Sequence, residues 1–280
     1  MLSIIILSYQ NPALLRLCLK SLAQALSKSV FSYEIIVVDN ASTPETRSVV
    51  ANEFSNEFKS IKLVSIKENA GYTRGNNEGM RAAAGDYLLI LNQDIVVPEN
   101  AIESLLEYFQ AHPEIGLIGP ELLNFNGTHQ DSYFRFYTPL TIFYRRLEHL
   151  PFARRILGNF LMRETDFSRI QKPNWISGAA FMTSRAATNQ VGLMDESLFH
   201  YFSDVDWAHR FWDNGYQVVY YPASKIYHYL GRTSKGRILI FDMLLNRTTH
   251  WHMRDAIVYF WKNWLWNWKP KSQYNYATTH

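Results

Sequence analysis

Apolar runs alternate with amphipathic stretches along the first half of the chain. Four runs are continuous enough to predict buried strands, at residues 3–8, 33–39, 61–66 and 87–91. Between the first two, Asn11 and Pro12 predict the start of a helix that ends near Leu26, because they supply a cap and a first-turn proline. Strands that alternate with helices over short connections predict an α/β fold, with a mostly parallel sheet covered by helices on both faces.

The remaining segments predict a less regular second half. Residues 69–79 are rich in glycine, which weakens a helix, so we expect a loop that leads into a helix ending near Ala84. No clear period covers 139–172, and we expect an irregular excursion there. Other elements are predicted as a helix at 99–111, a strand at 116–119, a hairpin turn at 126–127, a strand at 175–184, a helix at 201–213 and a strand at 217–221.

Two of the predicted strands end in acidic residues. Asp94 closely follows the strand at 87–91, and Asp39 ends the strand at 33–39. Because open α/β sheets bind ligands at the carboxyl ends of their strands, Asp94 is a candidate ligand of Mg²⁺ or Mn²⁺ beside a nucleotide diphosphate. Asp39 could there accept the imide N–H of uracil or thymine. Both residues also have a simpler interpretation, as helix caps or turn formers.

A second acidic pair lies near the start of the helix predicted at 201–213. Asp204 and Asp206 flank an apolar residue, and Trp207 follows on an aromatic helix face. A carboxylate beside a hydrophobic wall can act as a general base for a hydroxyl. First-turn acidic residues are equally explained by the helix dipole. His228, between two tyrosines, can join Asp94 on a metal or serve only in packing.

Composition restricts the class of protein. The chain has 280 residues and 47% hydrophobic content, enough to bury a full core as one large domain or as a domain with an appendage. The start lacks the pattern of a signal peptide, and the one cysteine, Cys18, cannot form an intramolecular disulfide, so we expect a cytoplasmic protein. A nicotinamide-dependent oxidoreductase is disfavoured because no glycine fingerprint follows the first strand. Nucleic-acid binding is disfavoured because no recognition module is visible.

Positive charge is concentrated toward the C-terminus. The net charge is +3, but from Lys225 onward nine Lys or Arg face two Asp, which gives 9 − 2 = +7 there and leaves −4 for the rest. Residues 256–269 combine four tryptophans with lysines and are too short and interrupted to span a bilayer. Since Trp with Lys suits a membrane interface, this segment either contacts a membrane or packs its aromatic side on the rest of the protein.

In combination, the motifs resemble those of the family 2 inverting glycosyltransferases, most strongly the branch that includes bacterial rhamnosyltransferases. The likeness runs from Leu2 to about Ser234 and rests on the segments 6–10, 37–42, 69–71, 75–79, 91–94 and 203–206. It implies a GT-A fold in residues 1–234, with a nucleotide-sugar-binding half at 1–98 and an acceptor half at 99–234. The aromatic and basic segment at 235–280 would be helical.

The resemblance also implies which residues bind the donor. Ser8 and Asp39 would contact the nucleoside, with Asn69 and Arg74 as helpers. Residues 92–94 occupy the place of the family's Asp-x-Asp motif. The residue at its last position, Asp94, would coordinate a divalent cation that bridges the donor diphosphate.

Four further positions are compared with the family pattern. Asp204 occupies the place of the family's base and would deprotonate the acceptor hydroxyl, while His228 would lie near the metal and the leaving diphosphate. Asn92 departs from the family pattern because it offers a neutral oxygen to donor and metal. Ser203 stands where the family commonly has Glu, so a partner of the base is missing.

The implied activity is inverting transfer of a sugar from a TDP- or UDP-sugar to a saccharide acceptor. The favoured donor is TDP-rhamnose, and the acceptor would belong to a cell-surface polysaccharide or a lipid-linked oligosaccharide at the inner face of the cell membrane. Ser203 keeps an alternative open. In that alternative the protein is a nonenzymatic subunit that keeps the fold to bind a nucleotide sugar or a partner glycosyltransferase.

Overall fold

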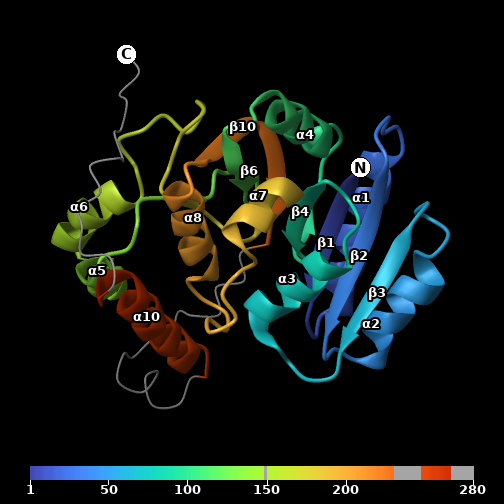
Figure 1. Cartoon of the computed structure of the whole chain (residues 1–280), viewed down its shortest axis with the longest axis horizontal. Helices are drawn as coiled ribbons and strands as arrows, with labels where there is room; N and C mark the ends of the chain where they lie inside the picture. Colours follow the sequence, from blue (N-terminus) through green and yellow to red (C-terminus); the bar gives the residue numbers. More distant parts are fainter. Residues whose placement is uncertain (148–149, 230–246, 266–280) are drawn as a thin grey trace.

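The computed structural model describes residues 1–147, 150–229 and 247–265 (Figure 1). Its strands are β1 (Leu2–Ser8), β2 (Tyr33–Asn40), β3 (Ile61–Ile66), β4 (Tyr87–Asn92), β5 (Ile95–Val96), β6 (Ile115–Leu123), β7 (Tyr133–Phe134), β8 (Trp175–Ile176), β9 (Ala180–Ser184) and β10 (Gln217–His228). Its helices are α1 (Pro12–Leu26), α2 (Pro44–Ser48) with the π-helical turn η1 (Val49–Glu53), α3 (Gly71–Ala82), α4 (Ala101–Ala111), α5 (Pro139–Arg146), α6 (Pro151–Phe160), α7 (Arg185–Val191), α8 (Ser203–Asp213) and α10 (Arg247–Leu265).

Eight strands form one sheet in the order β3-β2-β1-β4-β9-β6-β10-β5. The first four are parallel, which confirms the predicted α/β fold and the four strands predicted in the first half. β9 is antiparallel to both of its neighbours, β10 is parallel to β6, and β5 pairs antiparallel with β10. Because β1, β2 and β4 run the same way, their C-terminal residues lie together, and we call this the carboxyl edge.

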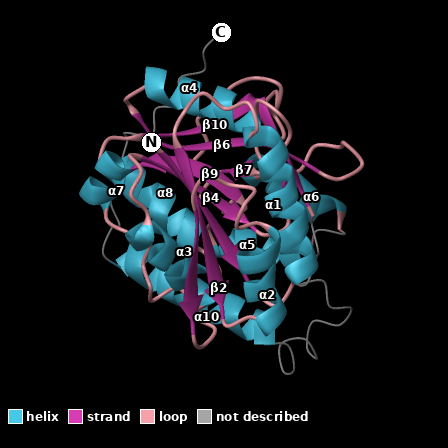
Figure 2. Cartoon of the chain, turned by 90° about the vertical axis from the view of Figure 1, so that its right-hand side faces the viewer, coloured by secondary structure: helices cyan, strands magenta, loops and turns pink. Residues whose placement is uncertain are grey.

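Helices cover both faces of the sheet (Figure 2). One face packs on α1, η1 and α4, in a core that includes Leu15 and Leu105. The other face packs on α3, α7 and α8, in a core that includes Met80, Trp207 and Phe211. Continuous apolar strands are therefore explained, since a parallel sheet buried on both faces has no solvent side.

Helix α3 corrects the prediction of a loop at 69–79. Gly71 adopts a positive φ of 78° at its first residue. A Cβ on Gly75 would lie 2.4 Å from Leu7, and one on Gly79 would lie 2.3 Å from Ile5. Gly75 and Gly79 thus let the helix approach β1 closely, so a glycine-rich composition that locally predicts a loop is here compatible with a helix.

The segment from 139 to 184 holds two further corrections. Helices α5 and α6 occupy most of the stretch predicted to be irregular. The strand predicted at 175–184 is divided into β8, which pairs with β7 in a separate two-stranded sheet, and β9, which enters the main sheet. Between them lies the loop 177–179, which reaches the carboxyl edge because Asn92 N–H donates to the Ala179 carbonyl at 2.9 Å.

The predicted turn at 126–127 is confirmed, since Leu123 pairs antiparallel with His129 and Gly127 has a φ of 81°. Helix α10 confirms that part of the C-terminal segment is helical. Its Ala256 and Tyr259 are buried against the domain, while Trp261 is 67% exposed. Within the described residues, none of the helices is both long and apolar enough to cross a bilayer. Part of the tryptophan-rich stretch, from 266 onward, lies outside the described residues.

Candidate functional site

The ends of β1 and β4 are joined at the carboxyl edge by Gln93. The fully buried Ser8 hydroxyl donates to Gln93 Oε1 at 2.9 Å. The same oxygen accepts Tyr9 N–H at 3.2 Å, and Gln93 Nε2 donates to the Tyr9 carbonyl at 2.8 Å. The middle residue of the 92–94 motif therefore fixes the position of Ser8, a role that sequence reasoning did not assign to it.

Asp39 lies fully buried near the end of β2, beside Ser8 in the strand register. One carboxylate oxygen accepts Ser42 N–H at 2.8 Å, which is the turn-forming contact that the sequence left open. The other accepts Nε of the largely exposed Arg47 at 3.0 Å. A carboxylate has about four lone-pair sites, so both oxygens keep the capacity for a further donor such as an imide N–H.

Asn69 belongs to a network that starts helix α3. Its Oδ1 accepts Asn40 Nδ2 at 3.0 Å and Gly71 N–H at 2.9 Å, while Asn40 Oδ1 accepts Ala70 N–H at 2.8 Å. Asn40, which sequence reasoning missed, is as central here as Asn69. Arg74 stands apart from this network, with its side chain 60% exposed and its Nε 4.0 Å from Glu78.

Asp94 and His228 come together because β5 pairs with the end of β10, where His228 is opposite Ile95. Nε2 of His228 lies 3.5 Å from Oδ1 of Asp94. Although Oδ1 is buried, no hydrogen-bond donor among the described residues serves it. A buried carboxylate oxygen without a hydrogen-bond donor costs folding free energy, and a bound cation at this atom would offset that cost.

Gln130 fixes the orientation of the His228 ring. Its Nε2 donates to the His228 carbonyl at 2.8 Å and to Asn124 Oδ1 at 2.9 Å, which leaves its Oε1 to accept from His228 Nδ1 at 3.0 Å. In that tautomer Nε2 carries a lone pair and faces the unpaired oxygen of Asp94. Two lone pairs directed at one space are the arrangement of metal ligands, supported by the outer hydrogen bond usual for a ligating histidine.

These side chains fit a divalent cation that takes most of its ligands from phosphate oxygens and water. In the described part of the chain, no three His, Cys, Asp or Glu side chains gather to hold a metal. Asp94 and His228 alone would supply two ligands, with Asn92 half-buried at the end of β4. Mg²⁺ is commonly bound in this way, through one or two protein groups plus phosphate oxygens and water.

Asp204 lies in the first turn of α8 against the loop 177–179. Its Oδ2 accepts Gly178 N–H at 3.0 Å and its Oδ1 accepts Val205 N–H at 2.9 Å. Burial raises the pKa of this carboxyl to about 6, against the lowering effect of these backbone donors. The neighbouring Tyr72 hydroxyl donates to the Gly178 carbonyl at 2.6 Å, so α3 also supports the loop. The Asp204 carboxylate is therefore more basic than an exposed aspartate.

The neighbours of Asp204 in α8 play other parts. Asp206 is buried and paired with Arg210 at 3.0 Å and Lys262 at 3.1 Å, so it is structural. Ser203 is 1% exposed, and no described partner reaches its hydroxyl. Gly178 and Tyr72 were missed at the sequence level, because neither residue type signals chemistry and both act through the fold.

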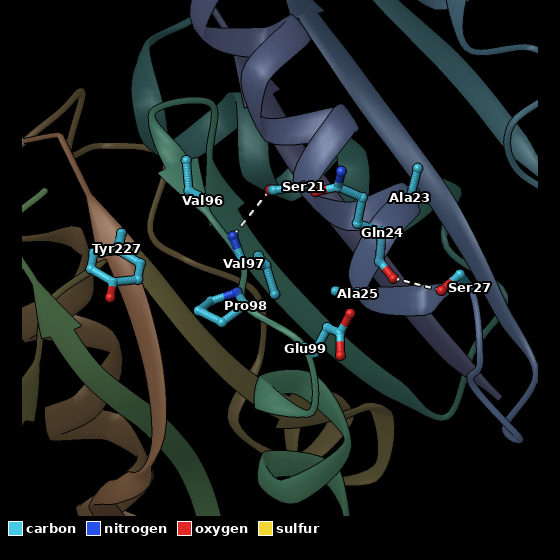
Figure 3. A pocket seen from close by; sticks show the side chains of 10 residues that line it. All are labelled: Ser21, Ala23, Gln24, Ala25, Ser27, Val96, Val97, Pro98, Glu99 and Tyr227. Carbon is cyan, nitrogen blue, oxygen red and sulfur yellow. Dashed lines mark hydrogen bonds between the residues drawn. The ribbon is translucent and has the colours of Figure 1, made fainter.

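A cavity of about 610 Å³ lies away from these residues (Figure 3). It is bordered by the second half of α1 and the segment 96–99. Ser21 accepts Val97 N–H there, and Ser27 donates to the Gln24 carbonyl. None of the predicted site residues lines this cavity, so the candidate site is the open carboxyl edge with the start of α8.

A family model described as "Glycosyl transferase family 2" matches residues 3–171. The N-acetylglucosaminyl-diphospho-decaprenol L-rhamnosyltransferase of Mycobacterium tuberculosis is 26% identical over 251 residues, which cover 84% of this chain and 78% of the relative. A low-salt glycan biosynthesis hexosyltransferase of Haloferax volcanii is 26% identical over 213 residues, covering 75% of this chain and 61% of that protein.

Two solved structures share the fold. Staphylococcus aureus TarS superposes with a TM-score of 0.58 at 17% identity, over 82% of this chain and 36% of TarS. GalNAc-T7, solved with UDP, GalNAc and Mn²⁺, superposes with a TM-score of 0.61 at 18% identity, over 86% of this chain and 46% of its own. The chain thus spans less than half of either solved protein, and at these identities the likeness concerns the fold.

Proposed function

The chain belongs to glycosyl transferase family 2, and from that premise we propose that it transfers a sugar from a nucleotide diphosphate donor to a saccharide acceptor. The observation that carries the proposal is the Asp204 carboxyl, whose pKa is raised to about 6 by burial at the start of α8. Such a group is ionised at neutral pH and still basic enough to take a proton. A raised pKa of this kind suits a carboxyl that takes up a proton during the reaction.

The donor would lie along the carboxyl edge. Asp39 would accept the imide N–H of the base through a remaining lone pair, and Ser8, whose hydroxyl donates to Gln93, would lie beside it. Asn69 shapes the start of α3 around the nucleoside, and the exposed Arg74 can reach toward anionic parts of the donor. Ser8, Asp39 and Asn69 lie at or beside the ends of adjacent parallel strands, where α/β sheets bind nucleotides.

Asp94 and His228 would hold the divalent cation, with Asn92 beside them contacting donor and metal. When bound, Mg²⁺ or Mn²⁺ would neutralise negative charge that grows on the leaving nucleotide diphosphate. The protein's own contribution is geometric. Gln130 accepts from His228 Nδ1 and so orients the ring with Nε2 directed at Asp94 Oδ1, which would place both ligands before the donor arrives.

Transfer would proceed in one displacement. Asp204 takes the proton of the acceptor hydroxyl while that oxygen forms a bond to the anomeric carbon of the donor sugar. The bond from the anomeric carbon to the phosphate oxygen breaks, and the nucleoside diphosphate leaves. Attack from the face opposite the leaving group inverts the configuration. Rhamnose is the favoured sugar and TDP-rhamnose the favoured donor, supported by the Mycobacterium relative, whose name states rhamnosyl transfer to a lipid-linked acceptor.

Nucleoside diphosphate release is the test of this activity. Purified protein is incubated with Mg²⁺ or Mn²⁺ and a panel of UDP-, TDP- and GDP-sugars, with and without an extracted lipid-linked acceptor, beside Asp204→Asn. We expect release from one donor that requires acceptor and disappears in the variant. Absence of release from every donor, with nucleotide binding retained, would favour the nonenzymatic subunit that Ser203 leaves open.

We further propose that the protein contacts the inner face of a membrane from the cytoplasm. Helix α10 has an exposed apolar stripe of Met253, Ile257 and Trp261, spaced four residues apart on one helix face. Phe143 on α5 and Phe152 on α6 are also more than half exposed, and the segment 139–163 carries five Arg and one Glu. Apolar stripes beside positive charge suit an anionic bilayer surface.

Sedimentation with phosphatidylglycerol-containing vesicles tests this contact. We expect the protein to sediment with them and not with phosphatidylcholine alone, and expect Phe152→Asp with Trp261→Asp to reduce binding. Val30→Asp is the matched control, because Val30 is 90% exposed in the loop before β2. Equal binding by both variants would refute the assignment of this surface.

A further inference from the structure

Helix α10 buries a carboxylate beneath the segment that leads into the proposed base. Asp255 is 0% exposed. Its oxygens accept the backbone N–H groups of three successive residues, Phe199 at 3.1 Å, His200 at 2.8 Å and Tyr201 at 2.9 Å. The guanidinium of Arg254 adds a fourth donor at 3.0 Å. A buried charge is tolerated only when hydrogen-bonded in this way, so the contact is specific to a carboxylate.

The three residues form a tight turn into α8. Phe202 follows them with a φ of 63°, the left-handed region that an ordinary side chain rarely adopts. Its carbonyl accepts Asp206 N–H at 2.8 Å and so begins the helix. Such a conformation persists only where surrounding contacts determine it. Asp204 is two residues beyond Phe202, so the direction of its carboxylate depends on how this turn is held.

The same segment also contacts the other support of the base. The Phe199 carbonyl accepts Thr73 N–H at 3.4 Å, and Gly71 is so close that a Cβ there would lie 2.3 Å from that carbonyl oxygen. The next residue after Gly71 is Tyr72, whose hydroxyl donates to the Gly178 carbonyl, and Gly178 N–H in turn donates to Asp204. Asp255 therefore fixes a turn that leads into α8, which carries the base. The same turn contacts α3, which supports the base through Tyr72 and Gly178.

We infer that Asp255 is a positioning residue for Asp204, one that acts through the turn 199–202 and touches no substrate. The inference rests on the proposed function, since it assigns a support to the proposed base. It also gives α10 a role in transfer that is separate from its exposed apolar face. Helix α10 has a second anchor farther along its own length, where Lys262 pairs with Asp206 and with Asp195.

The experiment compares two anchors of the same helix. Asp255→Asn keeps the size of the side chain and one acceptor oxygen but cannot accept all the backbone donors, while Lys262→Met releases α10 at its other anchor. We expect Asp255→Asn to lower kcat by about 10- to 100-fold with little change in donor KM, because a small displacement of a catalytic group is costly. We expect Lys262→Met to retain kcat within a few-fold, at a similar loss in Tm.

Two readouts separate positioning from general destabilisation. In Asp255→Asn the acidic limb of the kcat profile should move to lower pH, since a displaced Asp204 is better hydrated. Amide hydrogen exchange at 199–202 should accelerate more than exchange across the β-sheet. An unchanged pH profile with fast exchange at the turn, or an equal loss of kcat in Lys262→Met, would overturn the inference. A wild-type protein that transfers no sugar would instead refute the proposed function, and the exchange comparison would still test the support of the turn.

Discussion

The carboxyl edge and the surroundings of Asp204 are built in different ways. At the carboxyl edge, side chains are held by residues of adjacent strand ends, as Ser8 is by Gln93 and Asn40 by Asn69. Asp204 is held by Gly178, in a loop between two sheets, and its turn is held by Asp255 in the last described helix. One region is supported by the sheet itself and the other by loops and a distant helix.

This difference concerns electrostatics as well as connectivity. Asp39 is buried but accepts a guanidinium and a backbone N–H, which stabilise its charge. Among the described residues Asp204 has only backbone donors, and burial prevails to raise its pKa to about 6. This contrast agrees with the proposed division of roles, in which the carboxyl edge binds the donor and the start of α8 carries the base.

Replacing the base tests the contrast most strongly. Asp204→Asn should lower kcat by roughly 10³-fold, within the range that general base catalysis contributes, and should leave donor binding intact. In the wild type, kcat/KM should fall tenfold per pH unit below pH 6, because the base must be ionised and its pKa in the free protein is about 6. Stopped assays across pH 4.5–8.5 and nucleotide titrations measure both effects. A flat pH profile would assign the base elsewhere.

The same substitution should make the fold more stable near neutral pH. The folded pKa of Asp204 is about 6 and the unfolded value is about 4, so the native state binds the extra proton between them. The free energy of unfolding therefore falls as pH rises through this window, by about 3 kcal/mol. Asp204→Asn removes this cost, so its advantage should appear at pH 7 and vanish below pH 4. Denaturant titrations of wild type and Asp204→Asn at pH 7 and below pH 4 test this expectation. Equal stability of the two proteins at pH 7 would contradict a desolvated Asp204 carboxyl.

Sequence patterns predict the residues of the carboxyl edge better than they predict the residues that support Asp204. Asp39 and Asp94 follow from apolar strands that end in polar residues, and parallel strand ends must meet. The roles of Ser8 and Asn92 came from the family resemblance. The supports of Asp204 have no such local signal. Gly178 lies in what the pattern predicts to be an unbroken strand, and the contact of Asp255 depends on tertiary packing over more than fifty residues of sequence separation.

The glycines of α3 show a second reason for the limit. Gly71, Gly75 and Gly79 lower helix propensity, and a local interpretation makes them a loop. Close approach to β1 outweighs that preference, since any side chain on Gly75 would overlap Leu7. Helix α6 was missed in a similar way, because Phe160 on its buried face packs on Trp175, which lies outside the helix in β8.

Metal dependence tests the two proposed metal ligands at the carboxyl edge, Asp94 and His228. Asp94→Asn or His228→Ala should raise the Mn²⁺ concentration for half-maximal turnover by roughly 100-fold, and Gln130→Met by about 10-fold, as loss of an outer hydrogen bond does. Mn²⁺ binding in the presence of UDP, measured by electron paramagnetic resonance, provides a readout independent of turnover. If Gln130→Met had no effect while His228→Ala did, the ring would not depend on Gln130 for its tautomer.

The smallest expected effect concerns the nucleoside contact of Asp39. Asp39→Asn exchanges a charge-assisted hydrogen bond for a neutral one, so UDP or TDP affinity should fall by about 1 kcal/mol, roughly fivefold. The matched control is Arg47→Met, which removes the ion pair of Asp39 from the exposed side. Calorimetric titration with uridine and with its N3-methyl derivative separates the two roles. N3-methylation should abolish the difference between wild type and Asp39→Asn, because the donor of that hydrogen bond is then missing. If Arg47→Met weakens binding as much as Asp39→Asn does, Asp39 serves the turn at Ser42 and the base is recognised by another group.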